Sequence, residues 1–325
     1  MRSLPLVKLF TPIVLLPNTP SLERAGHVHK NWIMDHVDTH GAVLLRNFES
    51  ETDPASSFSR LMETLSLKAF TDTAESAAPR TPVATYVWTA NEAPHDALIP
   101  FHHEMAQSAN PPRYVGFFCE NPPKEGEGRT PIVRSRDIAS ELRRSWPRCA
   151  EELDRRGVRY VRTLPEDDDL SSPIGKSWTT SFQTTTKEVC ERDLVSKGFK
   201  VCWNSDGSLT TMTPSCKVFD CDSIGRETFF NSIVAARTGW NDDRNVGTNA
   251  VVFGDGSHLT FECRAMLDYA ASFMEEEAVR ITWKAGDALI LDNRQVLHAR
   301  ETFDATTHRR ILASLWGPRV LSSTL

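Results

Sequence analysis

A histidine and a carboxylate two positions apart, in His102-His103-Glu104, are the residues whose types and spacing point most clearly to chemistry. The segment is expected to be extended, so that alternation turns His102 and Glu104 to one face and His103 to the other. If the register is shifted by one residue, His103 takes the ligand role. His298, which follows an apolar strand predicted at 288–291, supplies a second imidazole. Two histidines and one carboxylate form the facial triad of non-haem Fe(II) sites, with zinc as the alternative metal.

Two adjacent arginines, Arg309 and Arg310, begin a predicted strand eleven positions after His298. A guanidinium group binds a carboxylate through two parallel hydrogen bonds, which suits the far end of a dicarboxylate cosubstrate. Strand alternation sends the two arginines to opposite faces, so only one of them can do this. Thr130, in the turn and strand over 126–132, offers a hydroxyl group to the same carboxylate.

The elements that must position these residues are short strands mixed with helices. A helix is expected after Asp53-Pro54, an N-cap followed by proline at the first helical position. Helices are also predicted over 135–157, divided at Pro147, and over 259–277. Strands are predicted at 41–46, 82–88, 158–163 and 288–291, with a hairpin joining 200–203 to 209–212. Because strands and helices do not alternate as βαβ units, the pattern predicts one α+β domain over 1–325, built on a β-sandwich or barrel.

The composition is that of a folded globular protein: 325 residues, 40% hydrophobic and 25% charged. The net charge is −6 and there is no basic stripe, so nucleic acid is not expected as a partner. We expect no signal peptide and no membrane span, since no uncharged apolar run reaches the roughly 18 residues that a span needs. The cysteines number 7 and contain no C-x-x-C pair, which predicts reduced thiols and a cytoplasmic location.

Several segments, taken together and in this order, resemble the taurine dioxygenase and clavaminate synthase-like superfamily of Fe(II)- and 2-oxoglutarate-dependent oxygenases. The similarity is greatest to the plant clavaminate synthase-like proteins and extends over nearly the whole chain. The segments that carry it are residues 40–46, 89–92, 100–107, 166–169, 172–175, 230–232, 253–256 and 309–315.

This resemblance implies a double-stranded β-helix, or jelly-roll barrel, with helical insertions. It implies iron bound by His102, Glu104 and His298, and 2-oxoglutarate whose distal carboxylate is held by Arg310 and Thr130, with Arg309 as the alternative to Arg310. The reaction implied is O₂-dependent decarboxylation of 2-oxoglutarate to succinate and CO₂, coupled to hydroxylation of a small polar or carboxylate-bearing metabolite. Because halogenases of this group lack the ligand carboxylate, Glu104 argues against halogenation.

The substrate contacts are the least determined part of the site. Asn91, Asn231 and Arg237 lie in or near the similar segments and are candidates to orient a polar substrate. The competing interpretation is that such asparagines satisfy loop backbone. Asp292 or Asn293 is a candidate to hydrogen-bond a ligand histidine.

Two other functions compete with the oxygenase. A catalytically silent protein could bind metal or 2-oxoglutarate on the same fold, and a zinc hydrolase could use the same three ligands. The oligomeric state stays open, with a homodimer as one alternative.

Overall fold

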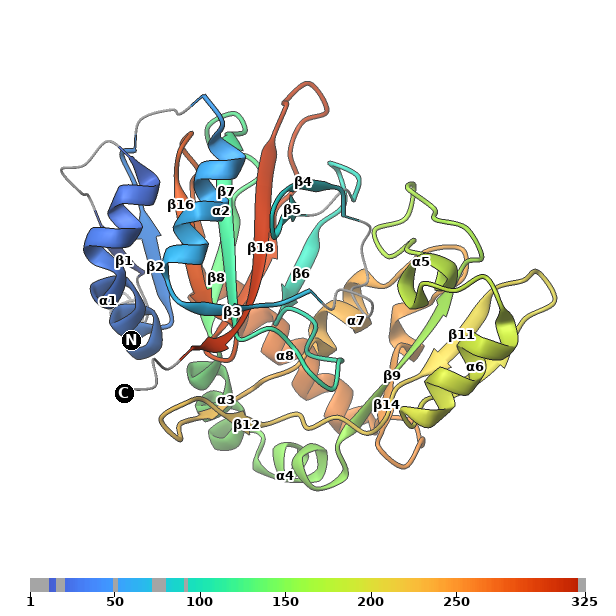
Figure 1. Ribbon diagram of the computed structural model, residues 1–325. Helices are drawn as coiled ribbons and strands as arrows, with labels where there is room; N and C mark the ends of the chain where they lie inside the picture. Colours follow the sequence, from blue (N-terminus) through green and yellow to red (C-terminus); the bar gives the residue numbers. More distant parts are fainter. Residues whose placement is uncertain (1–11, 16–20, 49–51, 72–79, 91–92, 321–325) are drawn as a thin grey trace, which may run out of the picture.

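Apolar residues follow one another almost without interruption along the central strands of the largest sheet, as expected where both faces of a sheet are buried. The computed structural model describes residues 12–15, 21–48, 52–71, 80–90 and 93–320. Within them the sheet has eight strands in the order β1-β2-β16-β7-β18-β5-β4, and β3 also pairs with β18 (Figure 1). The strands are β1 (Ile13–Leu15), β2 (Ala42–Leu45), β16 (Ala288–Asp292), β7 (Tyr114–Asn121), β18 (Arg310–Arg319), β5 (Val87–Thr89), β4 (Pro82–Ala84) and β3 (Leu67–Ala69).

Two helices, α1 (Leu22–His40) and α2 (Pro54–Thr64), pack against one face of this sheet (Figure 1). The predicted cap of α2 is present, since the Asp53 side chain accepts a hydrogen bond from the backbone N–H of Ser56. Phe58 and Met62 of α2 are fully buried against the sheet. Gly116 of β7 allows this close packing, because a Cβ atom there would lie 2.9 Å from Sδ of Met62.

A second, four-stranded sheet faces the other side of the large sheet and carries the histidines. Its order is β15-β8-β17-β6, and the layer between the two sheets is apolar. Phe117 and Leu289 from the large sheet meet Ile132 from the second sheet in this layer. The strands are β15 (Val279–Ile281), β8 (Thr130–Arg134), β17 (Val296–Arg300) and β6 (Ile99–His102).

The remaining elements form a third sheet, a two-stranded sheet and a group of helices, and their core also includes residues of the second sheet such as Phe101 and Leu297. Figure 1 shows α7 and α8 beside the second sheet, and the third sheet beyond them with α5 and α6. The third sheet has the order β10-β11-β9-β14. The elements are α3 (Ser135–Ser145), α4 (Pro147–Arg156), β9 (Val158–Leu164), α5 (Trp178–Phe182), α6 (Lys187–Ser196), β10 (Lys200–Trp203), β11 (Leu209–Met212), β12 (Asp220–Cys221), β13 (Glu227–Thr228), α7 (Ile233–Gly239), the 3₁₀ turn η1 (Gly247–Asn249), β14 (Val251–Phe253) and α8 (Phe261–Glu277).

The sequence predicted the mixed α+β class correctly, and two local predictions were wrong. The strand expected over 82–88 is divided into β4 and β5, because the chain turns at Tyr86, whose φ is 56°. The extended segment expected to include Glu104 ends with β6 at His102. The described strands do not close into a barrel. Among the described helices, none has the length and apolar character required to span a bilayer.

Candidate active site

The two candidate ligand histidines lie opposite each other on neighbouring strands. β17 pairs antiparallel with β6, and the register places His298 directly across from His102. Their ring centroids are 4.3 Å apart. The carboxylate of Glu104 joins them: its Oε2 lies 3.8 Å from Nε2 of His298, and one donor atom from each of the three residues lies within 4.8 Å of the other two. The structure therefore brings together the three residues that the sequence singled out.

Glu104 reaches the histidines from a turn, and a distant asparagine fixes that turn. The Asn293 side chain accepts from the Glu104 backbone N–H (2.7 Å) and donates to the Glu104 carbonyl (2.9 Å) and the Pro112 carbonyl (2.9 Å). The next residue, Met105, has a φ of 52°, in the left-handed region. Asn293 thus acts on the carboxylate ligand, where the sequence had suggested that Asp292 or Asn293 bonds a ligand histidine.

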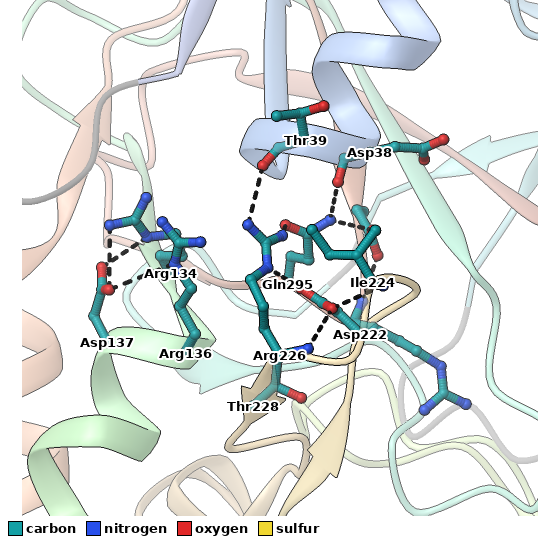
Figure 2. Close-up of polar contacts among 12 residues, drawn as sticks. Asp38, Thr39, Arg134, Arg136, Asp137, Asp222, Ile224, Arg226, Thr228 and Gln295 are labelled. Carbon is teal, nitrogen blue, oxygen red and sulfur yellow. Dashed lines mark hydrogen bonds and ion pairs between the residues drawn. The ribbon is translucent and has the colours of Figure 1, made fainter.

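The turn that carries Asn293 is itself held by a polar network, shown in Figure 2. Gln295 donates to the Asp38 carbonyl at the end of α1 and to the Asp292 carboxylate, both at 2.6 Å. Arg226 donates to the Gln295 side chain and pairs with Asp222 at 2.6 Å. The hairpin of β12 and β13 and the last turn of α1 therefore hold the β16–β17 turn from both sides.

The protonation states of the cluster suit metal binding. Burial alone would raise the pKa of Glu104, but Arg80, His298 and His102 hold that pKa well below its usual range, so the group is a carboxylate. Burial, together with His298, lowers the pKa of His102 to about 4, so its imidazole is neutral at pH 7. The Pro100 carbonyl lies 2.9 Å from Nδ1 of His102, which leaves Nε2 as the ligand atom. Nδ1 of His298 is buried without a hydrogen-bond partner among the described residues.

His103 turns away from the cluster, as alternation predicted. It is fully buried, with Nδ1 against the Asn293 carbonyl and Nε2 3.0 Å from the Ser135 hydroxyl. Burial lowers the pKa of His103 to about 3. Both ring nitrogens are engaged, so this residue is a core histidine in the structure.

Two cavities meet at the cluster, and each includes His102 and Glu104 in its wall. The sheet-side cavity lies between the two sheets and is also lined by Phe117, Thr130, His298 and Arg309. The helix-side cavity is also lined by Pro173, Ile174, Ala235 and Trp240, and both cavities are partly open to solvent. A metal at the cluster would therefore face two separate binding spaces.

The structure places Arg309, and not Arg310, in the sheet-side cavity. Arg310 is 47% exposed and pairs with Glu120 at 2.7 Å, so the sequence-based preference for Arg310 does not fit this placement. The physical reason is the opposite direction of the two side chains where β18 begins. Burial, then Arg300, lowers the pKa of Arg309 to about 9, which still leaves it charged at pH 7. Thr130 lines the same cavity, and its hydroxyl accepts a hydrogen bond from Trp283 at 2.9 Å.

The candidate substrate residues are not brought to the cluster. Asn231 is buried, and its amide bonds the Val218 carbonyl and the Ile233 N–H, which is the backbone role that competed with substrate binding. Arg237 pairs with Asp268 at 3.0 Å. Neither residue lines the two cavities. Asn91 lies outside the described residues.

Two buried arginines at the site were not predicted. Arg300 lines the sheet-side cavity and follows His298 by two positions, so strand alternation could have identified it. Arg80 lines both cavities and donates to Oε1 of Glu104 at 2.9 Å. It precedes β4 in a loop, where no periodicity indicates the direction of a side chain.

Comparison with known proteins identifies the family of this chain. The model of the taurine catabolism dioxygenase TauD, TfdA family matches residues 17–316. A clavaminate synthase-like protein of Arabidopsis thaliana is 41% identical over 297 residues, which cover 91% of this chain and 87% of that protein. A taurine dioxygenase structure from Burkholderia xenovorans has a TM-score of 0.51 at 15% identity, covering 95% of this chain and 89% of the other. PvcB, described as an Fe, alpha-ketoglutarate dependent oxygenase, has a TM-score of 0.50 at 14% identity, covering 94% and 85%.

The fold and the family match define the class of protein, a non-haem Fe(II)- and 2-oxoglutarate-dependent dioxygenase that uses O₂. The chain belongs to the taurine catabolism dioxygenase TauD, TfdA family. The two solved structures share the fold of this chain at sequence identities of 15% and 14%. The sequence-based expectations of family, enzyme class and cofactors are confirmed.

Proposed function

We propose that His102, Glu104 and His298 bind the iron, and that Arg309 and Thr130 bind the distal carboxylate of 2-oxoglutarate in the sheet-side cavity. The observation that carries this proposal is a set of three donor atoms within 4.8 Å, next to a cavity that holds a buried guanidinium group. When bound, iron supplies the redox chemistry for decarboxylating 2-oxoglutarate to succinate and CO₂ and for hydroxylating a C–H bond.

Residues of this chain select and orient the cosubstrate. Nε of Arg309 donates to the Gly128 carbonyl at 2.9 Å, which orients the guanidinium and leaves its terminal nitrogens as donors for a carboxylate. The indole N–H of Trp283 donates a hydrogen bond to the Thr130 hydroxyl oxygen. The hydroxyl hydrogen of Thr130 is therefore free to be donated to the cosubstrate. Desolvation of Arg309 makes an anionic ligand favourable here, because a carboxylate compensates the buried charge.

The primary substrate binds in the helix-side cavity and is a small metabolite with a polar or carboxylate group. The two facing sheets form the double-stranded β-helix of a single clavaminate synthase-like oxygenase domain over residues 1–325, which is supported by the apolar layer between them. The protein acts in the cytoplasm, which is supported by seven free cysteines.

The test is anaerobic addition of Fe(II) and then 2-oxoglutarate to metal-free protein. Chelation of ferrous iron by the keto acid is expected to give a weak visible charge-transfer band in the wild type. His102→Ala, Glu104→Ala and His298→Ala are expected to lose the band and the coupled formation of succinate, because each removes a ligand. A folded variant with a wild-type band and turnover would exclude that residue as a ligand. Tight zinc binding with no band would favour the hydrolase alternative.

A further inference from the structure

Arg80 is a largely buried cation that the proposed function does not use. Its side chain is 10% exposed, and its only hydrogen bond among the described residues is the 2.9 Å bond from Nη2 to Oε1 of Glu104. Nε and Nη1 are buried with no partner among the described residues. The guanidinium group therefore lies in the wall of both cavities. Its Nε and Nη1 donors have no acceptor in the described part of the chain, and burying an unpaired donor costs free energy.

The partner of Arg80 is a carboxylate that the proposed function assigns to iron. A divalent cation on Glu104 would take over the charge compensation that Arg80 provides in the structure. Iron, Glu104, doubly charged 2-oxoglutarate and Arg309 together carry no net charge. Arg80 then adds one buried positive charge, which favours an additional ligand with a single negative charge.

Arg300 does not remove this requirement, because it is already occupied. Its guanidinium donates to three backbone carbonyl groups, those of Ala93, Pro94 and Ala97, and Asp96 is the nearby opposite charge. Arg300 thus holds the loop before β6, while Arg80 is left without such a set of acceptors.

The helix-side cavity indicates what else the ligand must carry. Its wall is mixed. Leu98, Ile99, Met105, Ile174 and Trp240 contribute apolar surface, and Gln107 and Ser232 contribute uncharged polar groups. Among the described residues that line it, Arg80 is the only cation and Glu104 the only carboxylate. A ligand with an ammonium group would find no acidic partner there once Glu104 binds iron. An apolar body with one anionic group fits this wall.

We propose that Arg80 binds the carboxylate of the primary substrate. Arg80 pairs with Glu104 while the metal site is empty and with the substrate carboxylate when the metal site is filled. The substrate is an apolar monocarboxylic acid. This inference rests on the proposed function only for the identity of the metal ligands. Arg80 is thus a specificity-determining residue, distinct from Arg309, which binds the cosubstrate.

The first experiment uses metal-free protein, so that it does not depend on iron chemistry. Straight-chain acids from butanoate to octanoate, and 3-phenylpropanoate, are titrated by calorimetry into the wild type, Glu104→Gln and Arg80→Gln/Glu104→Gln. Glu104→Gln removes the competing charge and keeps the side-chain shape. We expect at least one acid to bind Glu104→Gln about 10-fold more tightly than the wild type, because a charge-assisted pair is restored. The double variant is expected to lose this gain, and the corresponding primary amides should show none.

The second experiment uses the anaerobic complex with Fe(II) and 2-oxoglutarate. The best acid is expected to shift the charge-transfer band of the wild type, and Arg80→Gln should need about 10-fold more of it, with Arg80→Lys in between. The affinity of Arg80→Gln for 2-oxoglutarate should stay within about 3-fold of the wild-type affinity, because Arg80 does not bind the cosubstrate.

Each outcome separates the inference from the proposed function. If no acid in the series prefers Glu104→Gln over the wild type in metal-free protein, the inference is wrong even where the band forms. If Arg80→Gln weakens 2-oxoglutarate binding by more than about 3-fold, Arg80 serves the cosubstrate and the inference is also wrong. If the band never forms but the preference for Glu104→Gln is present, the anion site stands and the ligand assignment falls.

Discussion

At the scale of single residues, the direction of a side chain decides which of two identical groups takes part in the chemistry. Arg309 and Arg310 are neighbours with the same functional group, yet one lines the sheet-side cavity and the other pairs with Glu120 at the surface. The pairing of β18 with β7 shifts register between Arg310 and Ile311, at the point where the strand begins. Alternation could predict that the two arginines separate, but not which one points inward.

Replacing each of these two arginines in turn gives a prediction and its matched control. Arg309→Gln is expected to weaken 2-oxoglutarate binding by about 10- to 100-fold, because two charge-assisted hydrogen bonds are lost from a desolvated site. Arg310→Gln should change it by less than about 2-fold, since the ion pair it breaks is half exposed. Titration of the anaerobic charge-transfer band measures both. If Arg310→Gln weakened 2-oxoglutarate binding more than Arg309→Gln, Arg310 would be the residue that binds the cosubstrate.

The metal cluster was more predictable than the substrate contacts for a physical reason. His102 and Glu104 alone are a weak signal, but together with His298 and the resemblance over nearly the whole chain they predicted one metal site, and the structure places the three residues together. An asparagine amide serves equally well as a backbone partner, and Asn231 has that role. Arg80 could not be predicted, because its partner depends on the path of a loop and not on a repeating pattern.

At the scale of elements, the site depends on the pairing of β6 with β17 and on the turn that follows β16. The apolar runs and turn residues of the sequence were enough to predict most of these strands. The turn at Glu104 was not predictable from local sequence, because its partner Asn293 lies 189 residues away in the chain. Met105, the residue after Glu104, adopts a left-handed conformation that its side chain does not favour.

Replacing Asn293 should therefore weaken metal binding without removing a ligand. In Asn293→Ala the backbone N–H and carbonyl of Glu104 lose their partners, and we expect the affinity for Fe(II) to fall about 10- to 100-fold. The control is Asn245→Ala, because Asn245 bonds the N–H and carbonyl of Thr163 in the same way but away from the cluster. Both variants should lower the melting temperature. Equal metal affinity in the two would show that Asn293 has only a structural role.

At the scale of the whole molecule, the fold buries several ionisable side chains around the metal cluster and the turn that follows β16. His102 and His103 are buried with pKa values lowered to about 4 and about 3. Burial has the opposite effect on an acid and raises the pKa of Asp292 to about 6. The stability of the metal-free protein is therefore linked to pH at these positions.

The sign of this linkage gives a prediction for metal-free protein between about pH 6 and pH 5. Unfolding lets both histidines take up a proton, whereas Asp292 releases one, so the unfolded state gains about one proton net. The free energy of unfolding should then fall on acidification, by roughly 1 kcal/mol for each pH unit. The melting temperature, measured with a chelator present, should fall over this range.

A variant identifies the source of the pH effect. His102→Gln removes one of the two histidines, so histidine uptake and Asp292 release nearly balance and the melting temperature should become almost independent of pH in this range. A wild-type slope in this variant would show that other groups cause the effect. Saturating Fe(II) should also raise the melting temperature of the wild type, because the metal binds the folded protein and not the unfolded chain.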